Sequence, residues 1–451
     1  MAFLARENTV AGSGFNRWLV PPAALAIHLS IGQVYAFSVF NLPMTKLIGI
    51  TQAAPDDWKL TDLGWIFSIA IAFLGLSAAI LGRWVEEGGP RRAMFAAACC
   101  FGGGFLIGAL GIDLHNIWIV YFGYGVVGGI GLGLGYISPV STLIKWFPDR
   151  PGMATGMAIM GFGGGAMIGS PLAVSLMKYF SNDTSVGVAP TFIVMGIVYF
   201  IMMMFGVWAV RVPAAGWTPV GYVPSAAPRK LVTTANVSVD QAMRTPQFYL
   251  LWIVLCMNVT AGIGVLGQAS AMSQEMFPGV ISPIAAAGFV GLLSIFNMAG
   301  RFIWSSTSDY IGRRNTYMVY FLLGIALYAL VPTTAHMGNV ALFVLAYGII
   351  LSMYGGGFAT IPAYLRDVFG TMHVGAIHGR LLTAWSVAGV LGPVLVNYIR
   401  EYQINRGVAK ADAYSVTMYL MAGLLVIGFI ANFLMREVDR RYHYHALQGA
   451  E

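Results

Sequence analysis

Long apolar stretches, separated by short polar segments, run through almost the whole chain. Each stretch approaches or exceeds the roughly 20 residues that a helix needs to cross a bilayer. The pattern predicts twelve such spans, at residues 18–43, 63–85, 92–112, 116–138, 152–177, 190–210, 247–274, 283–308, 315–334, 339–363, 376–399 and 413–436. We therefore expect an all-α membrane protein with twelve transmembrane helices.

Composition agrees with this pattern and excludes a soluble multidomain protein. Of the 451 residues, 58% are hydrophobic and 10% are charged, whereas soluble domains carry about 25% charged residues. The net charge of +7 comes from Lys and Arg that gather mainly in alternate connections between spans, which is not a nucleic-acid footprint. By the positive-inside rule, these connections and both termini are cytoplasmic. No signal-peptide cleavage pattern follows the first span, so we expect that span to be retained.

The chain repeats itself at a spacing of 223 residues. Acidic, glycine, arginine and proline positions recur in pairs at this spacing: Glu86 and Asp309, Gly89 and Gly312, Arg91 and Arg314, Pro139 and Pro362, Gly152 and Gly375, Gly156 and Gly379, and Gly169 and Gly392. The pattern predicts two pseudo-symmetric six-helix halves, the parallel-repeat arrangement of one large class of transporters. The expected domains are the halves at 1–210 and 247–436, a cytoplasmic linker at 211–246 and a cytoplasmic tail at 437–451.

Two tight turns at matched positions are candidates for a conformational latch. Each turn places an acid and arginines around a glycine bend, where glycine tolerates a positive φ. We expect acid–arginine pairs to hold neighbouring helix ends in one conformation and release them in another. The latch residues are Glu86, Arg91, Asp309, Arg313 and Arg314. The alternative is a pair of plain solvated loops.

Arg301 is the one ionised residue in the stretch 282–308. An arginine at membrane depth costs at least about 2.5–3.5 kcal/mol on insertion scales, so it should face a protein interior or a watery cavity. No Asp or Glu lies inside any predicted span, which favours a bound anion over a structural ion pair. Asn297 shares its face one turn away, with Ser294 and Ser305. The planar guanidinium suits a two-oxygen carboxylate.

The two halves and their acid–glycine–arginine turns resemble the major facilitator superfamily. Narrower similarity to its oxalate–formate antiporter family, a neighbour of the monocarboxylate transporters, lies in four segments: Gln33–Phe40, Trp146–Gly152, Met243–Phe248 and Phe296–Arg301. The resemblance implies a secondary carrier of small organic anions that works by alternating access. It also places Tyr136 at the substrate cavity, and Tyr354 and Phe358 in an aromatic box over the substrate. Ordinary aromatic packing is the alternative for that pair.

The first and seventh spans add further binding candidates. His28 and Tyr35 are seven residues apart and share one helix face, whereas Gln33 is nearly opposite Tyr35. Gln33 and Tyr35 can both line a cavity only if Gly32 distorts the helix. His28 could titrate near neutral pH, or it is a buried group with satisfied hydrogen bonds. Gln268 in the seventh span is a similar candidate.

Trp385 in the eleventh span bears on the charge of the expected substrate. Members of the similar family that handle oxalate look as if they place a lysine at this position. With Arg301 as the one cation, a dicarboxylate would leave a second charge unpaired in a dry site, which is expensive. We therefore expect a monocarboxylate, moved by exchange or facilitated transport. Oxalate:formate antiport and proton-linked symport are the alternatives, and Asn297, which cannot carry a proton, weakly disfavours symport.

Other function classes find little support in the sequence. It contains no HExxH, GxSxG or P-loop pattern, so we do not expect an enzyme. The three cysteines lie in apolar spans without disulfide or metal spacing, and no cofactor is expected. The expected partners are a small carboxylate anion and the lipid bilayer, with no nucleic acid. We expect a monomer to suffice, in the cytoplasmic (inner) membrane of a bacterium.

Overall fold

The computed structural model describes residues 2–222, 231–266 and 268–444, and within them the chain is helical, without a β-strand. Residues 223–230 of the predicted linker and 445–451 of the predicted tail lie outside the described residues. Eleven of the described helices are long and apolar enough to cross a membrane. The eighth predicted span is the helix α12, Pro283–Ile311, whose 29 residues also suffice. The predicted all-α membrane fold is confirmed.

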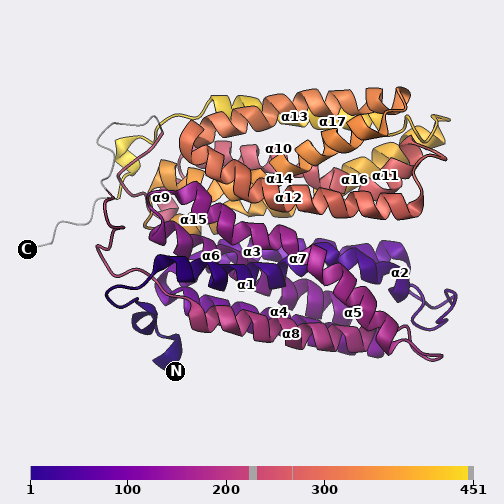
Figure 1. Ribbon diagram of the computed structural model, residues 1–451, viewed down its shortest axis with the longest axis horizontal. Coiled ribbons are helices and arrows are strands. Elements are labelled where there is room, and N and C mark those ends of the chain that lie inside the picture. Colours follow the sequence, from indigo (N-terminus) through magenta and orange to yellow (C-terminus); the bar gives the residue numbers. More distant parts are fainter. Residues whose placement is uncertain (1, 223–230, 267, 445–451) are drawn as a thin grey trace, which may run out of the picture. The chain divides into compact units, whose positions relative to one another are not determined.

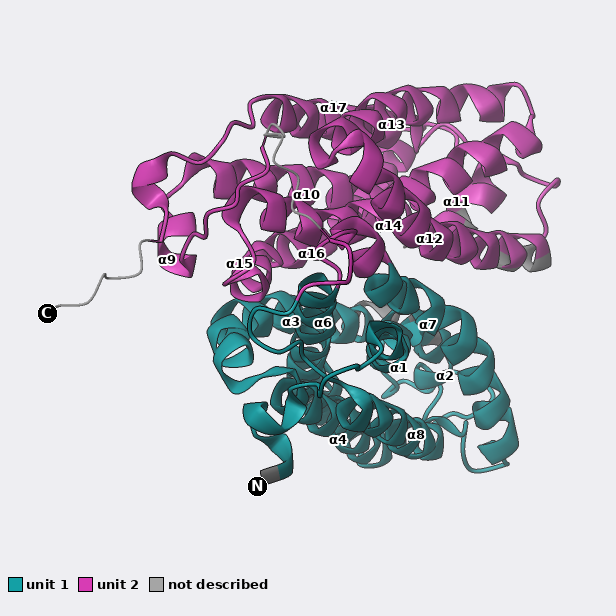
Figure 2. Ribbon diagram, turned by 60° about the vertical axis from the view of Figure 1, so that its left-hand side comes forward, with its two compact units in different colours: residues 1–146, 157–217 teal, residues 147–156, 218–451 magenta. Residues whose placement is uncertain are grey.

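The chain divides into two compact units, which Figure 2 shows in different colours. Unit 1 comprises residues 1–146 and 157–217, and unit 2 comprises 147–156 and 218–451. Residues 147–156, which the sequence pattern assigned to the N-terminal half, cluster with unit 2. The helix α7, Pro151–Phe180, therefore begins in unit 2 and continues in unit 1.

Unit 1 is built from long helices joined by short connections (Figure 1). Besides α7 and the short 3₁₀ helices η1 (Ala2–Leu4), η2 (Arg6–Thr9) and η3 (Arg17–Leu19), its elements are α1 (Val20–Ile31), the 3₁₀ helix η4 (Gly32–Phe40), α2 (Asn41–Met44), α3 (Leu60–Gly88), α4 (Pro90–Asp113), α5 (Ile117–Val120), the π-helical turn η5 (Tyr121–Gly128), α6 (Gly129–Trp146) and α8 (Val188–Ala209). Because α5, η5 and α6 follow one another without a gap, they form a single span of 30 residues.

Unit 2 has the same kind of architecture. Its elements besides α12 are α9 (Val239–Ala242), α10 (Pro246–Leu266), α11 (Ala269–Met276), α13 (Arg313–His336), α14 (Val340–Phe369), α15 (Val374–Leu381), α16 (Thr383–Asn405), α17 (Ser415–Phe433) and the short 3₁₀ helix η6 (Arg440–Tyr442). The helices α15 and α16 are consecutive and make one span of 32 residues.

Helix boundaries repeat between the units at the spacing of 223 residues. The helices α3 and α12 both have 29 residues, and α4 and α13 both have 24. One glycine joins the helices of each pair, Gly89 at φ 83° and Gly312 at φ 86°, a left-handed conformation that favours glycine. Asn116 and Asn339, also 223 apart, both accept a backbone N–H as N-caps of the following helix. The duplication seen in the sequence therefore extends to the turns and caps that delimit each helix.

The same pairs of helices pack together inside each unit. In unit 1, α3 packs on α6, α4 on α8 and on α6, and α1 on α8 and α6. In unit 2 the equivalent contacts join α12 to α14, α13 to α17 and to α14, and α10 to α17 and α14. Each unit thus buries its apolar helix faces in the same arrangement, so the two units can be compared position by position.

Candidate functional site

Arg301 is fully buried on α12. Its Nε donates a hydrogen bond of 3.1 Å to Oδ1 of Asn297, one helical turn earlier. Its Cζ lies 5.3 Å from the ring centroid of Phe358 on α14, a distance at which a cation is attracted to the face of an aromatic ring. The guanidinium is therefore oriented by an amide on its own helix and by a ring on α14.

Buried aromatic rings extend from this arginine to α16. The rings of Phe358 and Trp385 are 4.3 Å apart between centroids, and Tyr354 meets Phe358 edge to face at 5.3 Å. Three helices thus bring together five residues that the sequence predicted for one site, and we call them the arginine–aromatic cluster: Asn297, Arg301, Tyr354, Phe358 and Trp385. Their role in binding stays a prediction.

Two glycines let α12 and α14 approach closely enough to form this cluster. A Cβ added at Gly300 would lie 2.6 Å from the backbone C and Cα of Ser352. A Cβ at Gly355 would lie 2.5 Å from Oδ1 of Asn297 and 3.1 Å from Cγ of Arg301. The contacts with Ser352 and with Oδ1 of Asn297 would be closer than real Cβ atoms come to other atoms, so small residues are required where the two helices cross.

Unit 1 gathers three of the predicted residues around a fourth aromatic ring. His28 stacks on Tyr136 at 5.2 Å, and its Nε2 lies 3.2 Å from the backbone oxygen of Tyr136. Phe162 on α7 meets the ring of Tyr35 at 5.0 Å and that of Tyr136 at 5.5 Å, edge to face in both cases. Phe162 was not among the residues predicted from the sequence, where its one signal is an aromatic residue within the glycine-rich run 161–165.

Gln33 and Gln268 occupy corresponding breaks in the first helix of each unit. The helix α1 stops directly before Gly32 and Gln33, whereas Gln268 is the N-cap of α11, between the described ends of α10 and α11. The expected distortion at Gly32, without which Gln33 and Tyr35 could not line one cavity, is present as the start of the 3₁₀ helix η4. The side chain of Gln33 accepts a hydrogen bond of 2.9 Å from the buried hydroxyl of Tyr124. Among the described contacts, none joins the side chain of Gln268 to the arginine–aromatic cluster.

The structure corrects the predicted pairing for Arg91 and Arg314. Arg91 is buried and donates to four backbone carbonyl oxygens: those of Phe3, Asn8, Val207 and Val210. Glu86 instead forms a salt bridge of 2.7 Å with Lys145. Arg314 donates to the carbonyl of Phe433 at 2.6 Å. Both arginines thus satisfy carbonyl groups of other segments, because each lies at the start of a helix that packs beside those segments.

Asp309 and Arg313 do form the predicted acid–arginine pair, at 2.5 Å. Arg313 also contacts Asp367 on α14 at 3.2 Å. The other partners of the Asp309 carboxylate are the backbone N–H groups of Gly152 and Met153, at 2.8 and 2.9 Å. A carboxylate is favoured at the positive end of a helix dipole, so Asp309 holds the first turn of α7 against the end of α12.

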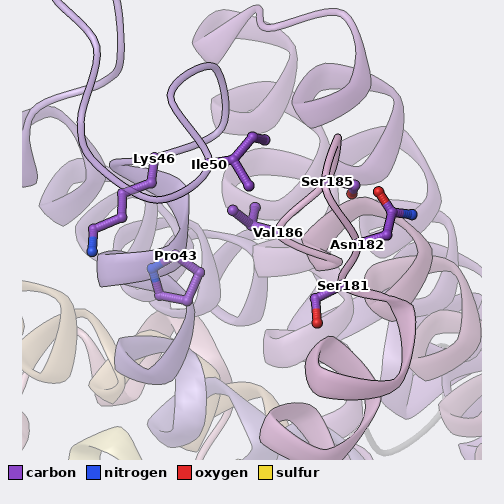
Figure 3. A pocket seen from close by; sticks show the side chains of 7 residues that line it. All are labelled: Pro43, Lys46, Ile50, Ser181, Asn182, Ser185 and Val186. Atoms are coloured by element: carbon purple, nitrogen blue, oxygen red, sulfur yellow. The ribbon is translucent and has the colours of Figure 1, made fainter.

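An open hollow of about 450 Å³ lies beside α2 and the last turn of α7, and Figure 3 shows its lining. Its lining residues are Pro43, Lys46, Ile50, Ser181, Asn182, Ser185 and Val186. None of the residues that the sequence predicted for the site lines this hollow. The buried arginine–aromatic cluster remains the better candidate.

Comparisons with known proteins agree with this architecture. The family model described as Major Facilitator Superfamily matches residues 9–393 and, in an overlapping match, 269–450. The oxalate:formate antiporter of Oxalobacter formigenes is 27% identical over 84% of this chain and 83% of its own length. Apicoplast pyruvate carrier 1 of Toxoplasma gondii is 24% identical over 72% of this chain and 68% of its own.

Solved structures show the same fold. The human organic anion transporter MFSD10 (TETRAN) superposes with a TM-score of 0.66 at 12% identity, over 93% of this chain and 100% of that one. At this level of identity the likeness establishes the fold alone.

Proposed function

This chain belongs to the Major Facilitator Superfamily, and we propose that it is a secondary carrier that moves small monocarboxylate anions across a membrane. The observation that carries the proposal is the buried guanidinium of Arg301, held between the amide of Asn297 and the ring of Phe358. A fixed cation deep in an apolar span marks a substrate or ion pathway. A guanidinium fork matches the two oxygens of a carboxylate.

The surroundings of Arg301 favour one negative charge on the substrate. The neighbouring rings of Phe358, Tyr354 and Trp385 are buried and carry no positive charge. A second carboxylate placed against them would lose its hydration without gaining a cation. Formate, acetate, lactate, pyruvate and glycolate each present one carboxylate and a small remainder that such rings accommodate. The names of two relatives, an oxalate:formate antiporter and a pyruvate carrier, support small carboxylates as the substrate class.

Alternating access is the mechanism that we infer. Broken helices at corresponding positions of two repeats are typical of substrate sites in such carriers, and the breaks at Gln33 and Gln268 have this character. A bound carboxylate would neutralise Arg301 and lower the cost of closing a dry cavity around it. Without the substrate, the charge opposes closure, which favours exchange over net flux. The pair of Asp309 with the first turn of α7 would act as a latch during this cycle.

The placement in the cell is part of the same proposal. Lys and Arg fall mainly in alternate connections, which supports cytoplasmic termini. We place the carrier in the cytoplasmic membrane of a bacterium, where it works as a monomer without a cofactor.

Ligand-dependent thermal stability of the purified protein tests the substrate class. Bound ligands stabilise a folded protein according to their affinity. We expect formate, acetate, lactate or pyruvate to raise Tm, oxalate to raise it less, and Arg301→Ala to abolish every shift. A larger response to oxalate would contradict the monocarboxylate assignment. Shifts that survive in Arg301→Ala would remove Arg301 from the site.

A further inference from the structure

Asn258 is a buried amide near the arginine–aromatic cluster that the proposed function does not use. It lies on α10, inside a candidate membrane span, and the residue is 6% exposed. Among the described residues, its Nδ2 has no hydrogen-bond acceptor. Buried amide donors in folded proteins almost always have a partner, and one without a partner carries an energetic cost. Such a donor in a carrier calls for a functional explanation.

The amide of Asn258 packs directly on the backbone beside Phe358. A Cβ added at Gly357 would collide with Nδ2 of Asn258 and lie 3.2 Å from its Cγ. Gly357 is the residue before Phe358, whose ring faces Arg301. One turn further along α10, Gly262 is in close contact with the ring of Tyr354. Asn258 and Gly262 therefore form the face of α10 that borders the two aromatic residues of the cluster on α14.

We propose that the amide of Asn258 donates a hydrogen bond to an oxygen on the carbon next to the substrate carboxylate. The preferred substrates are then 2-oxo and 2-hydroxy monocarboxylates. This inference rests on the proposed function, because it takes Arg301 as the ligand of the carboxylate. The amide is neutral, so it suits a keto or hydroxyl oxygen and adds no cation for a second carboxylate.

The glycine at position 357 is part of the same arrangement. Without a side chain, Gly357 leaves the amide of Asn258 room to lie against α14. Any larger residue there would push the amide away from its place beside Phe358. A binding site that supplies a hydrogen bond to a substrate oxygen rejects analogues that lack the oxygen, because its own polar group is then left unpaired. Asn258 and Gly357 would together provide this discrimination.

Competition experiments in proteoliposomes test the inference. Pyruvate, lactate and propionate share a three-carbon skeleton, and propionate lacks the oxygen at the second carbon. We expect pyruvate and lactate to compete about tenfold better than propionate in the wild type, the order of one buried hydrogen bond. In Asn258→Ala the ratio should fall toward one. Gly357→Ala should also lower the ratio, because its Cβ would displace the amide of Asn258 although Asn258 itself is not mutated.

Thr260→Val is the matched control. Thr260 is buried on the same helix and donates to the carbonyl of Cys256 within that helix, so we expect the wild-type ratio. Folding of each variant is checked by Tm, and we expect Asn258→Ala to remain folded because no hydrogen bond of its amide donor is lost. A wild-type ratio in folded Asn258→Ala would overturn the inference. Equal competition by propionate in the wild type would also overturn the inference about Asn258, but not the proposal of a carboxylate carrier. A lack of carboxylate transport would overturn both the inference and the proposed function.

Discussion

The guanidinium carbon of Arg301 lies 5.3 Å from the ring centroid of Phe358, and both side chains are fully buried. The contact joins α12 to α14, the two helices whose glycines allow close packing in unit 2. The ring of Phe358 also packs on Trp385 from α16. Arg301 therefore lies against the ring of Phe358 rather than at a helix end. We expect Arg301 and the neighbouring rings to determine both the charge and the size of the substrate.

Introducing a cation at Trp385 should extend the substrate range to dicarboxylates. In Trp385→Lys, an ammonium replaces an indole beside Phe358, so a second carboxylate would gain a partner. We expect the apparent affinity for oxalate, measured by thermal shift, to rise by at least about tenfold, equivalent to about 1.4 kcal/mol. Trp385→Phe is the control and should bind oxalate as weakly as the wild type does. A folded Trp385→Lys that ignores oxalate would show that this position does not set substrate charge.

The close approach of α12 and α14 can be tested by adding one methyl group. Gly300→Ala should destabilise the protein by about 1–3 kcal/mol, as overpacking does, because its Cβ would meet the backbone of Ser352. Gly291→Ala on the same helix is the control, since a Cβ there has nothing within 4 Å. It gains helix propensity without a clash, so its Tm should be unchanged or higher. Equal Tm values for the two variants would contradict the packing argument.

Removing the charge of Asp309 should release the first turn of α7. Asp309→Asn loses the salt bridge to Arg313 and weakens the hydrogen bonds from Gly152 and Met153, because charged acceptors bind more strongly. In a background without the native cysteines, Met153→Cys should react several-fold faster with a membrane-permeant thiol reagent when Asp309→Asn is added. The exposed Asp439→Asn should have no effect. Unchanged reactivity would argue against a latch.

The connection between α2 and α3 should loosen in acid. Burial would raise the pKa of the Asp57 carboxyl, but hydrogen bonds from the amides of Ala54, Ile48 and Gly49, and the charge of His115, together lower that pKa below its usual range. Because the pKa is lowered by folding, the stabilisation is complete above the ordinary value of about 4. It is lost as the pH falls through the lowered value.

Hydrogen exchange in this connection measures the effect of Asp57. We expect the amide protons of Ile48, Gly49 and Ala54, which bond to the carboxylate at 2.8–3.1 Å, to exchange faster in acid after correction for intrinsic rates. Asp57→Asn should show the faster exchange at neutral pH, and the neighbouring exposed Asp56→Asn should not. Protection that persists in Asp57→Asn would assign the order of this connection to other contacts.

Features that depend on spacing along one helix could be predicted from the sequence. Asn297 and Arg301 are four residues apart, so helical geometry alone brings them together, and their hydrogen bond is observed. The twofold repeat at 223 residues likewise anticipated the matched glycine turns at Gly89 and Gly312. The repeat does not extend at that spacing to the first helix of each unit, because the connection before α3 is longer than the one before α12.

Features that depend on packing between helices could not be predicted in this way. Phe162 and Asn258 carry no distinctive sequence pattern, and their neighbours come from helices far away in the chain. Arg91 was expected to pair with the acid of its own turn, but its hydrogen bonds reach Phe3 and Val207. Charge pattern identified the turn, and only the packed backbone shows which acceptors lie within reach.

Exchange of labelled pyruvate by purified protein in liposomes loaded with unlabelled pyruvate tests the central claim most directly. We predict that Arg301→Ala abolishes exchange and that Arg301→Lys retains a reduced rate, because lysine keeps the charge but not the planar fork. Arg441→Ala, which changes an exposed arginine, should exchange as the wild type does. Vigorous exchange by Arg301→Ala would contradict the account.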